Sequence, residues 1–372
     1  MGGSITIARV WGIDIRLHWT LVFVFALLVW SLAGAYLPLE YPGLGPTARV
    51  VIGVVAAVLF LASILLHELG HAWMARREGV PVNRITLFIF GGVAEIGEQA
   101  KTPGAEFRIA AGGPAVSLIL AIVFEAIDLA ARGNVYIAAP AHWLARINLL
   151  LLLFNLVPGY PLDGGRLLRA AVWRFTGSEQ TGWKVALASG QIVAFALIGW
   201  GVLTMLTGGF ADGVWLILIG WFLQNATAAE KSSVTLQREL SGATVQQAMG
   251  LTNEPAVPSR TKIRQLVDDY VLAAGQSVFL VVDDGVPRGV VTLTDLKSVP
   301  RDKWDWTSVA DVMTPWARLS RVEPRTGLLD ALRLMDAGGF GQLPVVDSGR
   351  LVGLLTREEI LRFLRMRTEV GT

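Results

Sequence analysis

The stretch "SILLHELGHAW" at residues 63–73 places His67, Glu68 and His71 at the end of a long apolar segment. The run before it, "VVIGVVAAVLFLASILL", carries no charged residue over positions 50–66. Ionisable side chains inside a membrane are costly, and by default they mark function. Residues four apart share one face of a helix, so both histidines can bind one metal ion, and in H-E-x-x-H the glutamate acts as general base. The stretch therefore predicts a metal site inside a membrane.

The composition agrees with a membrane-embedded chain. Hydrophobic residues make up 53% of the 372 residues and charged residues 17%, whereas soluble domains have about 25% charged residues. The absence of cysteine excludes disulfides, a cysteine nucleophile and a thiolate zinc site. A net charge of only +2 does not indicate a nucleic-acid partner. The N-terminal residues lack the pattern of a cleaved signal peptide. The expected partner is thus the lipid bilayer.

Six apolar segments approach or reach the roughly 20 residues that a bilayer requires. They lie at 17–37, 50–74, 107–131, 143–157, 185–206 and 214–229. The fourth is short and contains Arg146, Asn148 and Asn155, and the chain becomes polar near residue 230. The sequence predicts a polytopic α-helical membrane domain of about six transmembrane helices over 1–230. A linker over 231–243 and a soluble α/β region follow.

The loops between these segments differ in positive charge. One alternating set holds eleven basic residues, namely Arg9, Arg16, Arg76, Arg77, Arg84, Lys101, Arg108, Arg166, Arg169, Arg174 and Lys184. The other set holds three, namely Arg49, Arg132 and Arg146. The positive-inside rule then predicts a multi-pass protein of the cell membrane whose N-terminus and C-terminal region are cytosolic. The nine residues from His67 to Arg76 put the metal about 14 Å below the cytosolic surface.

A catalytic zinc usually has three protein ligands and one open position. His18 and His142 lie beside tryptophans at the edges of apolar segments, which is typical of the membrane interface. Asp163, in "NLVPGYPLDGGR", follows the fourth segment and emerges at the same membrane face as His71. Asp163 could equally cap the helix that begins there, and spacing alone does not decide between the two roles.

"HELGH" and "NLVPGYPLDGG" together resemble the motifs of the site-2 protease family of intramembrane zinc metalloproteases. The resemblance covers roughly residues 5–230 and includes "FGG" at 90–92 and "GGP" at 112–114. It implies one zinc ion per chain, with the ligands His67, His71 and Asp163 and with Glu68 as the base. It also implies that Asn155 donates a hydrogen bond to the scissile carbonyl oxygen. The alternative for Asn155 is an interhelical hydrogen bond within the bundle.

The segment "NRITLFIFGGVAEIGE" at 83–98 is rich in β-branched and aromatic residues and follows the metal helix directly. We expect a short re-entrant strand or hairpin whose edge pairs with an unwound substrate peptide. Non-helical backbone is tolerated at this depth only where protein or a water-filled cavity surrounds it. The alternative is a cytosolic hairpin without a substrate role.

The C-terminal region contains a repeat. "VVDDGVPRGVVTLTDL" at 281–296 matches "VVDSGRLVGLLTREEI" at 345–360, an offset of 64 residues, and each copy has a tight turn, at Asp284-Gly285 and at Ser348-Gly349. The repeat resembles a tandem pair of cystathionine-β-synthase (CBS) domains covering about 240–370. We place the two domains at 244–300 and 301–372.

The CBS resemblance implies a site for an adenine nucleotide such as ATP. The candidate contacts are Thr292 and Asp295 in the first copy and Thr356 and Glu359 in the second. Glu359 replaces the usual aspartate, which argues against a second nucleotide site. The alternatives are a homodimerising pair that binds no ligand, and carboxylates that only cap helices.

The sequence thus favours an intramembrane zinc endopeptidase that carries out regulated intramembrane proteolysis and is controlled by its CBS pair. The resemblance implies transmembrane substrates such as anti-sigma factors or other membrane-tethered regulators. One alternative is a CBS-regulated transporter or channel with an intramembrane His/Glu ion site. Another is a catalytically silent membrane binding protein.

Overall fold

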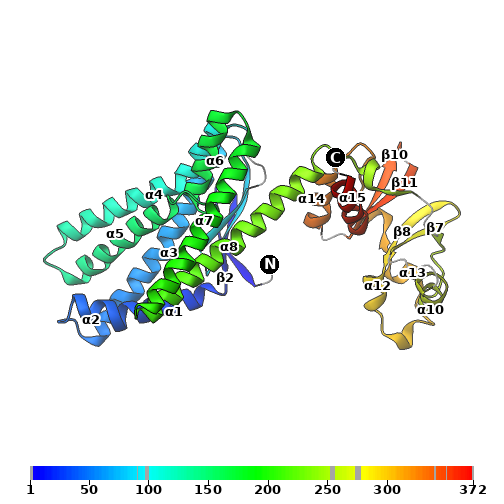
Figure 1. Cartoon of the computed structure of the whole chain (residues 1–372). Coiled ribbons are helices and arrows are strands. Elements are labelled where there is room, and N and C mark those ends of the chain that lie inside the picture. The colour runs from blue at the N-terminus through cyan, green and yellow to red at the C-terminus, as the bar shows by residue number, and fades with distance from the viewer. Residues whose placement is uncertain are drawn as a thin grey trace. The chain divides into compact units, whose positions relative to one another are not determined.

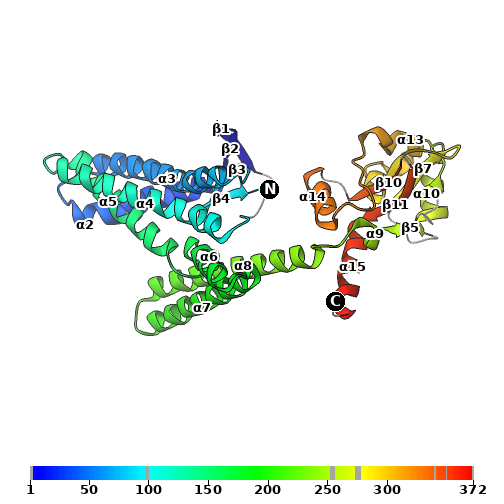
Figure 2. The ribbon, with the colours of Figure 1, turned by 90° about the horizontal axis from the view of Figure 1, so that it is seen from above.

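The computed structural model describes residues 3–89, 91–96, 100–251, 256–272, 278–338, 341–348 and 350–370. The chain divides into two compact units, Met1–Lys231 and Ser232–Thr372. Long helices and one small sheet make up the first unit, whereas short helices and two small sheets make up the second (Figures 1 and 2).

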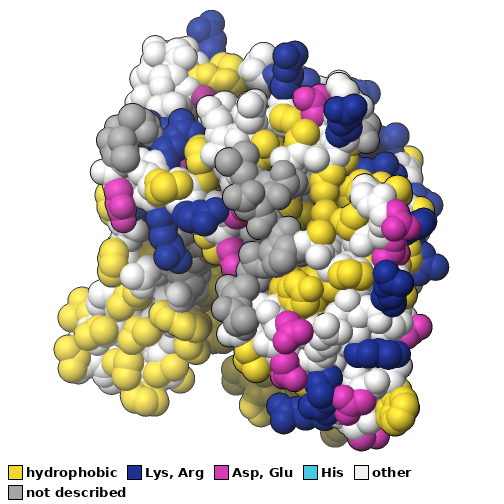
Figure 3. All heavy atoms as spheres, turned by 90° about the vertical axis from the view of Figure 1, so that its right-hand side faces the viewer, with side chains coloured by type: hydrophobic (Ala, Val, Ile, Leu, Met, Phe, Trp, Pro, Cys, Tyr) yellow, Lys and Arg dark blue, Asp and Glu magenta, His cyan; other side chains and the backbone are white. Residues whose placement is uncertain are grey.

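Within the described residues, five helical stretches are long and apolar enough to cross a membrane. They are Leu21–Glu40, which comprises α1 (Leu21–Ser31), the π-helical η1 (Leu32–Tyr36) and α2 (Leu37–Glu40), then α3 (Pro46–Arg77), α4 (Pro103–Ala130), α5 (Val135–Asn155) and α7 (Glu179–Leu206). Large apolar side chains on them face outward, among them Trp30, Ile119 and Leu203. Figure 3 shows a region of hydrophobic side chains almost free of charged ones. The predicted polytopic α-helical membrane fold is confirmed.

The sixth predicted segment, 214–229, lies inside the long helix α8 (Phe210–Leu240). Gln224 and Asn225 interrupt the apolar run there, and this helix is not among the five apolar stretches found in the described ranges. Helix α8 packs closely on α7, because a Cβ on Gly213 would lie 2.5 Å from the carbonyl oxygen of Gly201. The segment is therefore a helix of the same bundle.

The start predicted for the fourth segment, residue 143, is wrong, because the helix begins earlier in the chain. Helix α5 begins at Val135, eight residues before the predicted position 143, because the Asn134 side chain accepts a hydrogen bond from the Tyr136 amide at 3.1 Å and caps the helix there. Pro140 lies within the helix, and the backbone accommodates it. The longer helix reaches the length that a bilayer requires.

A four-stranded sheet lies beside the helices in the order β1-β2-β3-β4. Its strands are β1 (Ser4–Val10), β2 (Ile13–His18), β3 (Val82–Phe88) and β4 (Gly91–Ile96). The hairpin predicted over 83–98 corresponds to β3 and β4, while Phe90 and residues 97–99 lie outside the described residues. The hairpin of β1 and β2 had no sequence prediction, and β2 joins β3 in parallel.

This sheet packs on the ends of α3 and α4. The shared core contains Ile13, Val82 and Ile85 of the strands together with Ala72 and Ala75 of α3 and Ile109 of α4. All of these side chains are buried. The β3–β4 hairpin is thus fixed against the last turns of α3, beside the predicted metal ligands.

In the second unit the elements recur at the offset of 64 residues. The first copy has α9 (Val245–Ala248), β5 (Gly250–Leu251), β6 (Ala256–Val257), α10 (Ile263–Leu266), η2 (Val267–Val271), β7 (Val278–Asp283), β8 (Val286–Thr292) and α12 (Leu293–Lys297). The second has η3 (Arg301–Lys303), α13 (Val309–Val312), β9 (Thr314–Pro315), η4 (Trp316–Arg318), α14 (Leu328–Gly338), β10 (Gln342–Asp347), β11 (Arg350–Thr356) and α15 (Arg357–Val370).

Each copy lends its first strand to the other copy's sheet. Strand β5 pairs with β11, and β9 pairs with β8. A Cβ on Gly353 would lie 2.8 Å from the carbonyl oxygen of Gly250, so only glycine allows this close pairing. The boundary that the sequence placed at residue 300 therefore separates the repeats along the chain, whereas the two folded cores each contain residues from both sides of it.

Candidate metal centre

His67 and His71 lie one turn apart on α3, and each is only 4% exposed. Their imidazole rings are 4.9 Å apart between centroids, and their Nε2 atoms are 3.2 Å apart. Both rings therefore present the same nitrogen to one point on the inner face of the helix, as expected for residues four apart.

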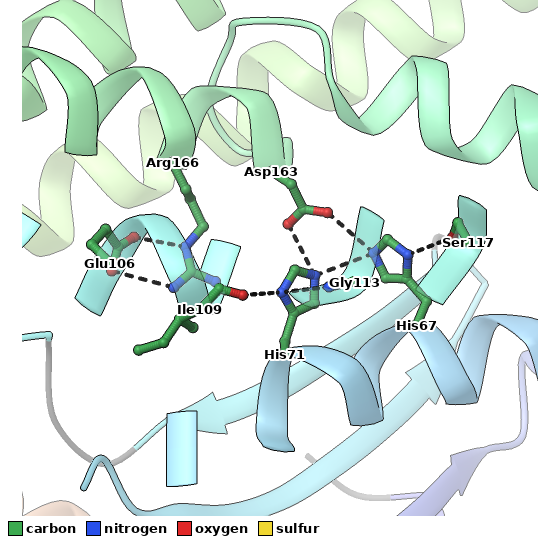
Figure 4. A network of polar contacts seen from close by, with 8 residues as sticks. All are labelled: His67, His71, Glu106, Ile109, Gly113, Ser117, Asp163 and Arg166. Carbon is green, nitrogen blue, oxygen red and sulfur yellow. Dashed lines mark hydrogen bonds and ion pairs between the residues drawn. The ribbon is translucent and has the colours of Figure 1, made fainter. Parts of the chain in front are cut away.

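Asp163 completes this arrangement from the first residue of α6 (Asp163–Thr176). Its Oδ2 atom lies 3.1 Å from Nε2 of His67, and its Oδ1 atom lies 3.2 Å from Nε2 of His71. The side chain is buried, and the three potential ligand atoms lie within 4.8 Å of one another (Figure 4). The three residues that the sequence pointed to as ligands thus meet in space, although Asp163 follows His67 by 96 positions along the chain.

Helix α4 determines which nitrogen of each imidazole faces the centre. The Nδ1 atom of His67 lies 2.8 Å from Ser117 Oγ, and Nδ1 of His71 lies 2.8 Å from the carbonyl oxygen of Ile109 (Figure 4). A carbonyl oxygen can only accept, so Nδ1 of His71 donates to it, and Nε2 is the ring nitrogen that faces the centre. Such outer partners orient metal-binding histidines. Two imidazole nitrogens and one carboxylate fit the three protein ligands of a catalytic zinc, which keeps its fourth position for water.

Glycines of α4 make room for the two rings. A Cβ on Gly113 would lie 2.5 Å from Nε2 of His67 and closer still to Nε2 of His71. At the adjacent residues the backbones of α3 and α4 touch, because a Cβ on Gly70 would lie 2.6 Å from the Gly112 carbonyl oxygen. The "GGP" motif therefore allows α4 to approach the metal ligands without covering their nitrogens.

The loop before Asp163 is held from several sides. The amide of Tyr160 donates to the Ala186 carbonyl oxygen of α7 at 3.2 Å, and the Thr227 hydroxyl of α8 donates to the Tyr160 carbonyl oxygen at 2.7 Å. A Cβ on Gly165 would clash with the backbone of Tyr160. The second glycine of "DGG" therefore lets α6 begin directly against its own loop, and this fixes where Asp163 points.

Glu68 points towards the sheet. A Cβ on Gly92 of β4 would lie 2.7 Å from Cδ of Glu68, so the strand passes directly over the carboxyl group. Glu68 is half-buried, next to His67 on α3. This contact explains a glycine in "FGG", and it brings the predicted base next to the strand predicted to bind substrate.

Asn155 is the last residue of α5 and is half-buried. Its side chain makes no hydrogen bond with any residue that the structure describes. The interhelical bond considered from the sequence is therefore not found there. Directly after it, the carbonyl oxygens of Leu156 and Val157 pack against Gly164 of α6, so the end of α5 adjoins the start of the helix that carries Asp163.

The outer partners of this centre were missed at the sequence level. They are Glu106, Ile109, Ser117 and Arg166. For two of them the sequence offered a clue, because Glu106 and Arg166 are charged residues close to apolar segments. The structure buries Glu106 and partly buries Arg166. Ser117 and the Ile109 carbonyl gave no such clue, since a small polar residue and a backbone group look the same wherever α4 happens to pack.

In the second unit the four candidate nucleotide contacts form two equivalent helix caps. The Thr292 amide donates to Asp295 Oδ2 at 2.8 Å, and the Thr356 amide donates to Glu359 Oε2 at 2.9 Å. Burial raises the pKa of Glu359, although the amides of Thr356 and Gly250 donate to its carboxylate. Asp295 is half-buried, whereas Glu359 is buried against Gly250. The two carboxylates therefore differ in their access to a ligand.

Two family descriptions match the chain. Peptidase family M50 matches residues 55–133 and 127–200, and the CBS domain matches residues 309–366. The chain is 38% identical over 372 residues to Rip3 of Mycobacterium tuberculosis, which is named as a zinc metalloprotease, covering 98% of this chain and 93% of the relative. It is 26% identical to zinc metalloprotease MJ0392 of Methanocaldococcus jannaschii, covering 97% and 96%.

Among solved structures, the site-2 protease from Methanocaldococcus jannaschii is 29% identical and covers 61% of this chain and 94% of that one, with a TM-score of 0.43. The membrane bundle and its buried His-His-Asp group define a membrane metalloprotease. The chain belongs to peptidase family M50, the site-2 protease family of zinc metalloproteases, and it also carries CBS domains. The transporter and silent-binder alternatives considered from the sequence are thereby set aside.

We predict that Gly113→Ala lowers zinc occupancy, because the new methyl group would displace both imidazoles. Metal content of the purified protein measures this. Gly199→Ala is the matched control, since Gly199 also lies in a membrane helix but a Cβ there meets nothing within 4 Å. Full zinc occupancy in the Gly113 variant would contradict the packing argument.

Proposed function

We propose that this protein is an intramembrane endopeptidase that cleaves transmembrane segments of other membrane proteins, with one zinc ion held by His67, His71 and Asp163. The observation that carries the proposal is the convergence of three buried ligand atoms between helices that are apolar enough to span a membrane. Ionisable groups at such a depth are retained for function.

Each residue has a distinct part in the chemistry. Bound zinc supplies Lewis-acid polarisation of the scissile carbonyl and lowers the pKa of water. Glu68 accepts the proton of the attacking water and passes it to the leaving amine. Asn155 donates a hydrogen bond to the carbonyl oxygen, and the absence of another partner for its amide among the described residues supports this role.

The substrate pairs with the free edge of β4. In the order β1-β2-β3-β4 this strand is last, and Gly92 brings its backbone against Glu68. A peptide bond in a helix is shielded by its own hydrogen bonds, so a transmembrane substrate must unwind before cleavage. Addition as a fifth strand would satisfy its backbone while exposing the scissile bond.

The orientation follows from the loop charges. Basic residues concentrate at the ends of the helices nearest the metal site, including Arg76 and Arg77 in the last turn of α3. The N-terminus and the CBS pair then lie in the cytosol, and cleavage occurs near the cytosolic face. Substrates in this arrangement are membrane-tethered regulators such as anti-sigma factors.

The CBS pair regulates the protease by binding an adenine nucleotide, ATP among them, at Thr292 and Asp295. Asp295 is less buried than Glu359, which supports this choice, while Thr356 and Glu359 form the counterpart that serves as a cap. The pair also mediates homodimerisation. The alternative is a CBS pair that dimerises but binds no nucleotide. Measuring nucleotide binding by titration distinguishes these two hypotheses.

The first test compares metal content with proteolysis. His71→Ala should lose the zinc, because two ligands remain, whereas Glu68→Ala should keep about one zinc per chain and lose cleavage of a model transmembrane substrate. Glu125→Ala is the control, since Glu125 is an exposed glutamate on α4. Full cleavage by the Glu68 variant, or wild-type protein free of zinc, would overturn the proposal.

The second test concerns the β3–β4 hairpin. Ile89→Pro removes the amide that donates to Thr20 Oγ1 at 3.3 Å and restricts the backbone between the strands. We expect lower cleavage with unchanged zinc content, while Ile89→Ala retains activity. Cleavage by the proline variant at the wild-type rate would show that the hairpin does not bind the substrate.

The third test addresses the nucleotide site. Asp295→Ala in the full-length protein should abolish ATP or AMP binding measured by calorimetry. Asp311→Ala is matched, because Asp311 closes an equivalent cap with Ser308 at 2.8 Å and has no proposed nucleotide contact. Wild-type protein that binds neither nucleotide would favour the ligand-free dimer.

A further inference from the structure

A buried ion pair lies beside the metal centre and has no part in the chemistry described above. Arg166 Nε donates to Glu106 Oε1 at 2.9 Å, and a second guanidinium nitrogen lies 3.5 Å from Oε2 (Figure 4). Glu106 is 2% exposed. Burying a pair of this kind costs desolvation free energy, so the pair need not stabilise the fold. Its position beside the metal centre therefore suggests a different role.

Arg166 follows Asp163 by three residues on α6. Side chains three apart on a helix are neighbours and form ion pairs. Without Glu106, the guanidinium would have the Asp163 carboxylate as its nearest anion on its own helix. Bidentate pairing of arginine with a carboxylate is strong. Such a contact would occupy the oxygens that now face His67 and His71 at 3.1 and 3.2 Å.

Glu106 prevents this from the opposite helix. It lies on α4 one turn before Ile109, whose carbonyl orients His71, and its Oε1 is also 3.7 Å from Arg169. Arg169 in turn pairs with Glu179 at 3.3 Å and stacks on Trp183 at 4.1 Å. Arg169 thus has partners other than Glu106, whereas the ion pair found for Arg166 among the described residues is the one with Glu106.

We propose that Glu106 is a positioning residue that holds the Arg166 guanidinium away from Asp163 and so keeps the aspartate available to the metal. This inference rests on the proposed zinc ligands. It assigns to α4 the control of all three ligands, since the same helix orients both histidines through Ser117 and the Ile109 carbonyl.

The test is zinc affinity of the full-length protein in detergent, measured by competition with a chromogenic chelator. Glu106→Gln should weaken zinc binding by about 10- to 100-fold, the range for outer-shell substitutions. Adding Arg166→Gln to that variant should restore affinity to within a few fold of wild type, because the competing cation is gone. Arg166→Gln alone should bind zinc normally, with Arg169 still near Glu106.

Arg108→Gln is the matched control, because it breaks an exposed ion pair between α4 and Glu78, at 2.6 Å, whose side chains contact none of the three proposed ligands. Its zinc affinity should equal that of wild type. A Glu106 variant with wild-type affinity overturns the inference, and so does a double variant as weak as the single one, which would indicate a purely structural clamp. Thermal unfolding of each variant identifies a folding defect. Zinc-free wild type would instead defeat the proposed function itself.

Discussion

Two imidazole Nε2 atoms and one carboxylate face a single point inside a bundle of apolar helices, and much of the membrane unit is arranged around that convergence. Polar groups at this depth have no bulk water to satisfy them, so each requires a protein partner. Helix α4 supplies these partners without contributing a ligand. Its Ser117 and the Ile109 carbonyl occupy the outer nitrogens of the rings, and Gly113 leaves the inner nitrogens uncovered.

The third residue of this group, Asp163, lies on another helix, and its position depends on a separate set of contacts. The loop before Asp163 is fixed by Ala186 of α7 and Thr227 of α8, and α6 is tied to α4 through Arg166 and Glu106. The centre is therefore complete only when α6 docks on α4.

The CBS pair illustrates how a repeat in sequence becomes one folded unit. Each copy donates a short helix and strand to the other, and Met249 and Met313 pack at equivalent glycines in the two sheets. Neither copy has a complete sheet without its partner segment. The two helix-initiating carboxylates nevertheless differ, because Glu359 is longer than Asp295 and reaches the Gly250 amide.

The sequence by itself determined the membrane fold, the metal-binding motif and the repeat, because apolar length, four-residue spacing and a fixed offset are local properties of the chain. It also indicated Asp163, but spacing left open whether that residue was a ligand or a cap. Only the tertiary structure decided this geometry, since Asp163 and His67 are 96 positions apart and meet through the packing of α6 on α4. The same holds for the hairpin of β1 and β2, for the partners Ser117 and Glu106, and for the exchange of strands between the repeats. Each depends on which faces meet, and that is settled by close contacts between distant segments rather than by the pattern within any one of them.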